Sequence, residues 1–368
     1  MIVAMKKHGI SRRKFIGTAS VAAISPALFG MQDLFTDKTT GKLSKEIVSI
    51  VRIKNGNIPK AVDEAIDLLG GIKALTEGRN KILLKPNLVA PDRNCTTKPE
   101  VVKALAHLML KAGKSVKIGE GSAAAPSFNI FGEETCRTKK KEVLDAMQQS
   151  VFDTLGYTEL ASSLKVPLVN LHSGHMVEVM LNNGLAAQSV KIHKEVFEAD
   201  LVCSVPMMKT HVLATVTLAM KNLIGLYPGT EYYSVRSWLH EKAAERGSTG
   251  VSYEIVDMNH AVRTGLSVID ASTAMEGDGP SSGDLVDMGL IVAGTSPLAT
   301  DMVGTALMGF DISEIPYIKL AHETGMSPAS LSDIEIRGQN IDDCKRQFKK
   351  PNIVRWNDIS KLWGVREV

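Results

Sequence analysis

Short apolar runs alternate with segments of helical periodicity along most of the chain. Buried strands are predicted by apolar, largely β-branched runs at 46–53, 81–85, 115–119, 166–171, 201–205, 266–269 and 289–293. Helices are predicted where apolar residues recur at helical spacing, at 58–69, 97–111, 142–155, 190–198, 216–223 and 298–308. This alternation predicts an α/β, Rossmann-like fold with a mostly parallel sheet and helices on both faces.

Local composition divides the chain further. A capping box from Thr97 to Glu100 is expected to open the helix at 97–111, and the polar, turn-rich segment 126–141 is expected to be a surface loop. Between 226 and 250 the composition shifts toward Tyr, Trp, Glu, Arg and Gly, which predicts an excursion between core elements and is consistent with a lid. We expect a linker at 31–45, a single α/β domain at 46–338 and a C-terminal extension at 339–368.

The N-terminus carries a pattern typical of export. Arg12 and Arg13 precede a large apolar residue and a weakly apolar stretch at 18–30, which predicts a twin-arginine signal peptide over residues 1–30. The expected partner is the twin-arginine translocase and the expected location is periplasmic or otherwise exported. About 20 apolar residues are needed to span a bilayer, so no transmembrane span is expected in the mature chain. If the small residues at 25–27 are not cleaved, the signal would remain as a membrane anchor.

Charge and length exclude some classes of protein. The 368 residues are 44% hydrophobic, enough for a large core. Removing the signal leaves 38 basic and 40 acidic residues, a net charge of about −2. We therefore expect no nucleic-acid partner, and we interpret the basic stretch at 345–350 as a solvated surface.

The four cysteines stand far apart in the sequence, at Cys95, Cys136, Cys203 and Cys344. No CxxC spacing is present, so the chain has no cysteine motif for an iron–sulfur cluster or a zinc ribbon. In an oxidising compartment four cysteines allow three disulfide connectivities, which the sequence does not separate.

Polar residues follow four of the predicted strands. They lie at 85–87, at 119–122, at 209–211 continuing to 221–222, and from 270 to 280. Ligands of open parallel sheets bind outside the carboxyl ends of the strands, and charge buried there is costly without a partner. The four clusters therefore predict one shared polar cleft.

The residue types suggest roles in that cleft. Lysines with nearby amides and hydroxyls suit a carboxylate or phosphate, so we expect a small anionic ligand. The substrate-binding candidates are Lys85, Asn87, Thr210, Lys221 and Asn222. The catalytic candidates are Glu120, as proton donor or acceptor, with His211 and Lys209. The alternative for each lysine is a surface salt bridge with no role in ligand binding.

A divalent metal is a further hypothesis, because imidazole and carboxylate groups recur near the cleft. The candidate ligands are His211, His240, Asp270, Glu276, Asp278 and Asp301. Their spacing matches no known metal motif, and a structural role is the alternative for each.

Six short motifs, taken together and in order, resemble the domain-of-unknown-function 362 family. They are Lys85-Pro86-Asn87, Gly119-Glu120-Gly121, Val205-Pro206 with Lys209-Thr210-His211, Lys221-Asn222-Leu223-Ile224-Gly225, Met275-Glu276-Gly277 with Gly279-Pro280, and Ala299-Thr300-Asp301. The resemblance covers about residues 46–338 and implies an α/β domain. Members are often fused to ferredoxin-type cluster domains, which implies redox or metal chemistry; the cysteines of this chain lack that motif.

Three functions remain open on the sequence alone. The first is an exported, metal-dependent or redox-related enzyme that acts on a small anionic substrate. The second is a non-catalytic periplasmic binding protein for a carboxylate or phosphate. The third is an assembly factor for another exported metalloprotein.

Overall fold

The computed structural model describes residues 45–247, 250–262, 264–354, 358 and 363–368. The predicted signal peptide, with Arg12 and Arg13, and nearly all of the predicted linker lie outside these residues. Within the described part of the chain, no helix has both the length and the apolar character needed to cross a membrane.

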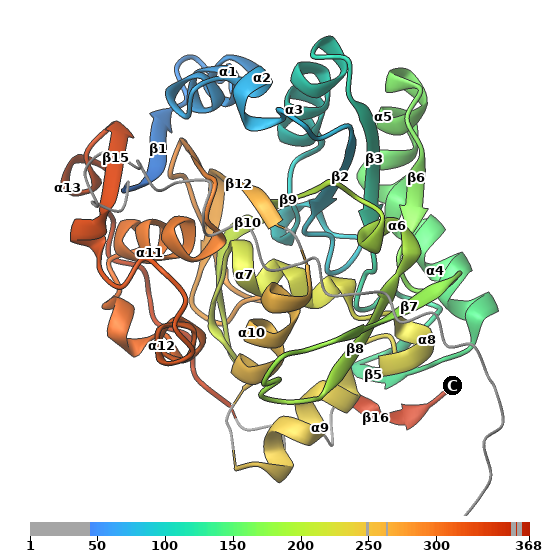
Figure 1. Ribbon diagram of the computed structural model, residues 1–368. Coiled ribbons are helices and arrows are strands. Elements are labelled where there is room, and N and C mark those ends of the chain that lie inside the picture. Colours follow the sequence, from blue (N-terminus) through green and yellow to red (C-terminus); the bar gives the residue numbers. More distant parts are fainter. Residues whose placement is uncertain (1–44, 248–249, 263, 355–357, 359–362) are drawn as a thin grey trace, which may run out of the picture. The chain divides into compact units, whose positions relative to one another are not determined.

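The main sheet is mostly parallel, as predicted, and runs across Figure 1 from β15 to β6. Its strands in spatial order are β15 (Ile334–Gly338), β1 (Glu46–Arg52), β14 (Leu290–Gly294), β12 (Thr264–Glu276), β9 (Leu201–Val205), β2 (Lys81–Pro86), β3 (Ser115–Glu120) and β6 (Leu168–Asn170). On this path only β14 runs antiparallel to its neighbours, β1 and β12. The sheet branches at β12, which also pairs with β10 (Met207–His211) and β13 (Asp284–Val286), while β11 (Thr215–Thr217) pairs with β10.

Helices cover both faces of this sheet, as the alternation predicts. Successive strand residues enter different cores: Leu83 packs in one, whereas Ile82 and Leu84 pack in the other. The face of Ile82 is covered by α1 (Ile58–Leu68), α3 (Pro99–Lys111), α4 (Lys141–Leu155) and α5 (Tyr157–Leu164). The face of Leu83 is covered by α7 (Ala219–Asn222), α10 (Ser252–Ala261), α11 (Pro297–Leu307) and α12 (Pro316–Glu323). Burial on both faces explains why these strands are continuous apolar runs.

Shorter elements surround the sheet. The remaining helices are α2 (Ile72–Leu75), α6 (Lys194–Phe197), α8 (Gly229–Tyr232), α9 (Ser237–Glu245) and α13 (Ile341–Cys344), with 3-10 turns η2 (Arg93–Cys95), η3 (Leu223–Leu226), η4 (Ile312–Glu314) and η5 (Leu331–Asp333). Two small sheets comprise β4 (Ile130–Phe131), β5 (Glu134–Arg137) and β16 (Trp363–Glu367), and the hairpin β7 (Met176–Met180) with β8 (Ser189–His193). The expected loop at 126–141 thus contains β4 and β5.

Three local predictions are wrong. The helix predicted at 190–198 begins as strand β8 and only ends as helix α6, since β-branched residues at 190 and 192 pair with β7. The helix predicted at 216–223 splits into β11, α7 and η3. Thr97 is no N-cap: its hydroxyl donates to Val205 O at 2.6 Å and accepts from the Asn87 amide at 2.9 Å, while Lys98 precedes helix α3.

Two of the polar clusters lie on strands rather than in loops. Residues 209–211 form the second half of β10, and β12 continues from the predicted strand through Asp270 to Glu276. Residues after 338 reach the same region, because the Lys349 carbonyl accepts from the Gly277 amide and the Val354 amide donates to Val212 O. A separate C-terminal extension at 339–368 stays a prediction.

Candidate functional site

A pocket of about 520 Å³ lies at the carboxyl ends of β2 and β3, beside β10 and α7. Nine of the residues singled out in the sequence line it: Lys85, Asn87, Glu120, Lys209, His211, Lys221, Asn222, His240 and Asp278. The structure therefore brings parts of all four polar clusters to one cavity. Thr210, Asp270, Glu276 and Asp301 do not line it.

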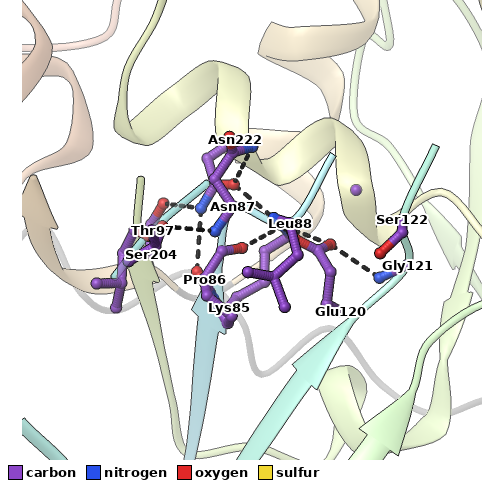
Figure 2. Close-up of polar contacts among 12 residues, drawn as sticks. Lys85, Pro86, Asn87, Leu88, Thr97, Glu120, Gly121, Ser122, Ser204 and Asn222 are labelled. Atoms are coloured by element: carbon purple, nitrogen blue, oxygen red, sulfur yellow. Dashed lines mark hydrogen bonds and ion pairs between the residues drawn. The ribbon is translucent and has the colours of Figure 1, made fainter. Parts of the chain in front are cut away.

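A buried ion pair joins the ends of the two neighbouring strands. Lys85 Nζ lies 2.7 Å from Glu120 Oε1 and 2.8 Å from Oε2, and both side chains are almost fully buried. Glu120 also accepts from the amides of Leu88 at 2.9 Å and Gly121 at 2.8 Å (Figure 2). Burial lowers the pKa of Lys85, and the attraction of Glu120 opposes this shift. These contacts hold Glu120 as an ion-paired carboxylate.

Asn222 connects helix α7 to this ion pair. Its Oδ1 accepts from Lys85 Nζ at 3.1 Å and from Asn87 Nδ2 at 3.2 Å (Figure 2). Its Nδ2 donates to Lys85 O at 3.0 Å and to Ser204 Oγ at 3.1 Å. Asn222 thus fixes the position of α7, and with it Lys221, relative to β2 and β9.

Two glycines allow the close approach of backbone to these charges. A Cβ on Gly225 would lie 2.5 Å from Glu120 Oε1 and 2.7 Å from Lys85 Nζ. A Cβ on Gly121 would lie 2.8 Å from Arg236 Nη2. Contacts this short force the neighbouring atoms to shift, so an alanine at either position would disturb the arrangement of these buried charges.

Three further cations of the pocket have no carboxylate within ion-pair distance among the described residues: Lys209, Lys221 and Arg236. Lys209 Nζ donates to the carbonyl oxygens of Cys95 at 2.6 Å and Pro280 at 3.1 Å. Burial lowers the pKa of Lys209 to about 8.

Arg236 is held by backbone carbonyls. It donates to Ser122 O at 3.0 Å, Ser234 O at 2.7 Å, Gly225 O at 3.1 Å and also to Gly121 O. Burial lowers the pKa of Arg236 to about 10, so the guanidinium remains charged at neutral pH. The four carbonyl oxygens accept from Nη1 and Nη2, whereas Nε is buried without an acceptor among the described residues, and none of these partners carries a negative charge.

Lys221 differs from the other two lysines. Its side chain is 9% exposed and lines the pocket, yet within the described part of the chain its Nζ has no hydrogen-bond acceptor. Burial, together with the positive charges of Lys209, Arg236 and Lys85, lowers the pKa of Lys221 to about 7. The neutral amine of Lys221 is therefore far more accessible near neutral pH than that of an ordinary lysine.

Two imidazoles of the same pocket are neutral at pH 7. Burial lowers the pKa of His240 to about 3, with Lys221 and Arg236 adding to the effect. Burial lowers the pKa of His211 well below its usual value as well. His211 Nδ1 accepts from the Leu213 amide at 3.0 Å, which leaves Nε2 as the protonated ring nitrogen.

Residues 82–306 match the family model described as Domain of unknown function (DUF362). The chain belongs to the DUF362 family. It is 28% identical over 289 residues to the thylakoid-associated protein sll1697 of Synechocystis sp., which covers 77% of this chain and 81% of that relative. It also aligns with the lactate racemase apoprotein from Thermoanaerobacterium thermosaccharolyticum at a TM-score of 0.42 and 16% identity. That alignment covers 74% of this chain and 58% of the racemase chain.

The residues proposed as metal ligands do not form a metal site in the described part of the chain. Among residues 45–247, 250–262, 264–354, 358 and 363–368, no group of three or more His, Cys, Asp or Glu side chains is placed to hold a metal ion. Asp270 accepts from the Lys98 amide at 2.9 Å, and Glu276 accepts from the Lys349 amide at 3.0 Å. Asp278 binds Asn352 through both of its carboxylate oxygens. These three carboxylates are therefore engaged with groups of the protein itself, and Asp270 and Glu276 lie within strand β12.

Asp301 has a positioning role at the start of α7. It accepts from the amides of Ala219 at 2.6 Å and Met220 at 3.1 Å, and from the Tyr317 hydroxyl at 2.8 Å. Burial raises the pKa of Asp301 to about 7. Thr210 is likewise structural, since its hydroxyl donates to Gly277 O at 2.6 Å.

Sequence reasoning missed Arg236 and the apolar walls of the pocket. Arg236 lies in the segment 226–250, whose change of composition was the one available indication, but a single arginine there has no motif around it. The walls combine small or aliphatic side chains from distant segments: Val89, Ala90, Ala123, Ala124, Ile130, Val212, Ile224, Val235 and Val354. No local pattern brings such residues together.

Proposed function

We propose that this protein is an enzyme that binds a small organic anion in the pocket and transfers a proton through Lys221. One observation carries the proposal: Lys209, Lys221 and Arg236 line one cavity, and the described residues offer none of them a carboxylate partner. The effective penalty for burying an ion is several kcal/mol, and an anionic ligand would offset it.

The size and lining of the pocket support an organic ligand rather than a bare inorganic ion. About 520 Å³ is in the range of small-molecule and cofactor sites. Apolar walls such as Val89 and Val235 suit a carbon skeleton, while Lys209 and Arg236 suit its carboxylate or phosphate.

The distribution of charge supports an enzyme over a binding protein. Capture of an anion needs cations, which Lys209 and Arg236 supply. It does not need an amine whose pKa is lowered to about 7, and a group with a pKa near the working pH suits acid–base catalysis. In this proposal Lys221 moves the proton, His211 donates a hydrogen bond from Nε2, and the Lys85–Glu120 pair fixes the two strand ends.

The described residues contain no group of side chains that could bind a metal for this enzyme. The carboxylates of Asp270 and Glu276 accept hydrogen bonds from backbone amides instead. The proposed reaction therefore includes no metal-dependent step.

The test is to incubate the full chain in D2O with a panel of small carboxylates and phosphates and to follow C–H signals by NMR. We expect one compound to exchange hydrogen or change structure, and Lys221→Met to abolish this while the exposed Lys103→Met does not. A compound that binds but stays unchanged would support the non-catalytic binding protein instead. Failure of the whole panel to bind would contradict the proposal.

We also propose that the protein acts outside the cytoplasm. The pattern at Arg12 and Arg13 supports this location, and so does the relative that is named as thylakoid-associated.

A further inference from the structure

The three lysines of the pocket have different surroundings. Lys85 donates to Glu120 and to Asn222, and Lys209 donates to two carbonyl oxygens. Each of these environments stabilises an ammonium ion. Lys221 has no such acceptor within the described residues, although it is nearly buried and faces the same cavity.

The nearby cations Lys85, Lys209 and Arg236 disfavour the charged form of Lys221. The imidazoles of His211 and His240 in the same pocket are neutral, so they supply no negative charge to offset this effect. A lysine placed beside other cations and removed from water presents a neutral, nucleophilic amine.

We propose that Lys221 forms an imine with the carbonyl carbon of an organic anion whose carboxylate or phosphate is held by Lys209 and Arg236. This inference rests on the proposed function and names the class of substrate, a keto or aldehyde compound carrying an acidic group. The remaining volume and the apolar walls accommodate the carbon skeleton between the two ends.

The step is balanced without any co-reactant. The Nζ lone pair forms a bond to the carbonyl carbon, and the C=O electron pair moves to oxygen, which receives one N–H proton. The C–O bond of this carbinolamine then breaks as the C=N bond forms, and the oxygen leaves as water with the second N–H proton.

Helix α7 is held in the way that such a nucleophile requires. Asp301 binds the amides of Ala219 and Met220 at its start, and Asn222 is fixed to Lys85 and Ser204 at its end. Lys221 therefore projects from a short helix anchored on both sides.

The experiment uses the full chain, pyridoxal 5′-phosphate as an anionic aldehyde and sodium cyanoborohydride to reduce any imine to a stable amine. Peptide mass spectrometry then locates the adduct. At pH 7 a lysine of ordinary pKa is only about 0.04% neutral. We expect Lys221 to be labelled at least about tenfold faster than any exposed lysine, with saturation at one adduct per chain.

Matched controls distinguish imine formation at Lys221 from binding of the anionic group. Pyridoxine 5′-phosphate has the same phosphate but no carbonyl, and it should compete with labelling without forming an adduct. Lys221→Arg should keep phosphate binding and lose the adduct, whereas Lys103→Met should change neither; melting temperatures report folding. Saturable binding of both compounds without an adduct at Lys221 would overturn the imine and leave the anion site standing. No binding, with adducts spread over surface lysines, would overturn both.

Discussion

Lys85 Nζ lies 2.7 Å from Glu120 Oε1, and the two side chains form a buried ion pair between neighbouring parallel strands. This pair, together with Asn222, fixes the strand ends and helix α7 around the pocket. The remaining cations of the pocket lack such a partner among the described residues, and this contrast is the basis of the functional proposal.

Removing the cation of the pair should be strongly destabilising. Lys85→Met leaves the Glu120 carboxylate buried without its partner, so we expect the free energy of unfolding to fall by about 3–5 kcal/mol. Replacing both residues, as Lys85→Met with Glu120→Gln, should cost less than the sum of the single changes. Urea unfolding measures both, with Lys103→Met as control. A loss below about 1 kcal/mol for Lys85→Met would contradict the importance of the pair.

The close approach of Gly225 predicts a steric effect on binding. Gly225→Ala would place a Cβ 2.5 Å from Glu120 Oε1, so the ion pair must shift, and we expect a loss of about 1–3 kcal/mol in stability together with weaker sulfate binding. Gly113→Ala is a useful control for a loss of stability away from the pocket, because its φ of +76° strains the backbone while its Cβ would meet open space. That variant should lose stability and keep its sulfate affinity. Equal sulfate affinity in both variants would contradict this account.

Asp301 predicts a specific pH dependence of stability. Burial raises the pKa of Asp301 to about 7 from 3.8, so the folded state binds the extra proton between these values. The contribution of Asp301 to the free energy of unfolding is fully present below about pH 4. It is lost as the pH rises through about 7, by up to about 1.4 kcal/mol per pH unit. Asp301→Asn should flatten this slope in urea unfolding, and the exposed Asp63→Asn should not. An unchanged slope in Asp301→Asn would show that Asp301 does not titrate in this range.

The proposed export predicts a result that is independent of the pocket. Replacing Arg12 and Arg13 together by lysine should retain the protein in the cytoplasm, because the twin-arginine pair is read by a receptor. Cell fractionation followed by immunoblotting measures this. Secretion that continues unchanged in the double variant would contradict the twin-arginine route.

The pattern of the sequence predicted the sheet and its two helical layers, because strands buried on both faces are continuous apolar runs. It also indicated nine pocket residues, since polar side chains at strand ends converge in a parallel sheet. It could not separate the roles of Asp270 and Asp301. Both are buried acids near DUF362 motifs, and only the fold shows that they bind backbone amides at Lys98 and at Ala219.

The same limit applies to the lysines. Lys85, Lys209 and Lys221 look alike in sequence, and each follows an apolar stretch. The pKa of each lysine depends on whether its Nζ contacts a carboxylate, a carbonyl oxygen or no acceptor. These contacts are made by residues far away in the sequence, so the local sequence does not reveal them. Arg236 was not predicted for the same reason, because its four carbonyl partners come from three separate segments of the chain.

The pocket should bind anions less tightly as its lysines lose their charge. The pKa of Lys221 is about 7 and that of Lys209 about 8, whereas sulfate keeps its charge throughout. Sulfate affinity should therefore fall as the pH rises from 6 to 9. Lys221→Met should remove the part of this decrease centred near pH 7 and leave the part near pH 8. A pH-independent affinity in the wild-type protein would contradict these assignments.

The most direct measurement is isothermal titration calorimetry of the full chain with sulfate at pH 6.5, comparing wild type, Lys209→Met and the exposed-lysine control Lys103→Met. The account predicts a single site that weakens by about 10- to 100-fold in Lys209→Met, as expected for the loss of one charged contact, and is unchanged in Lys103→Met. No binding by the wild type, or equal affinity in all three proteins, would contradict the claim that this pocket is an anion site.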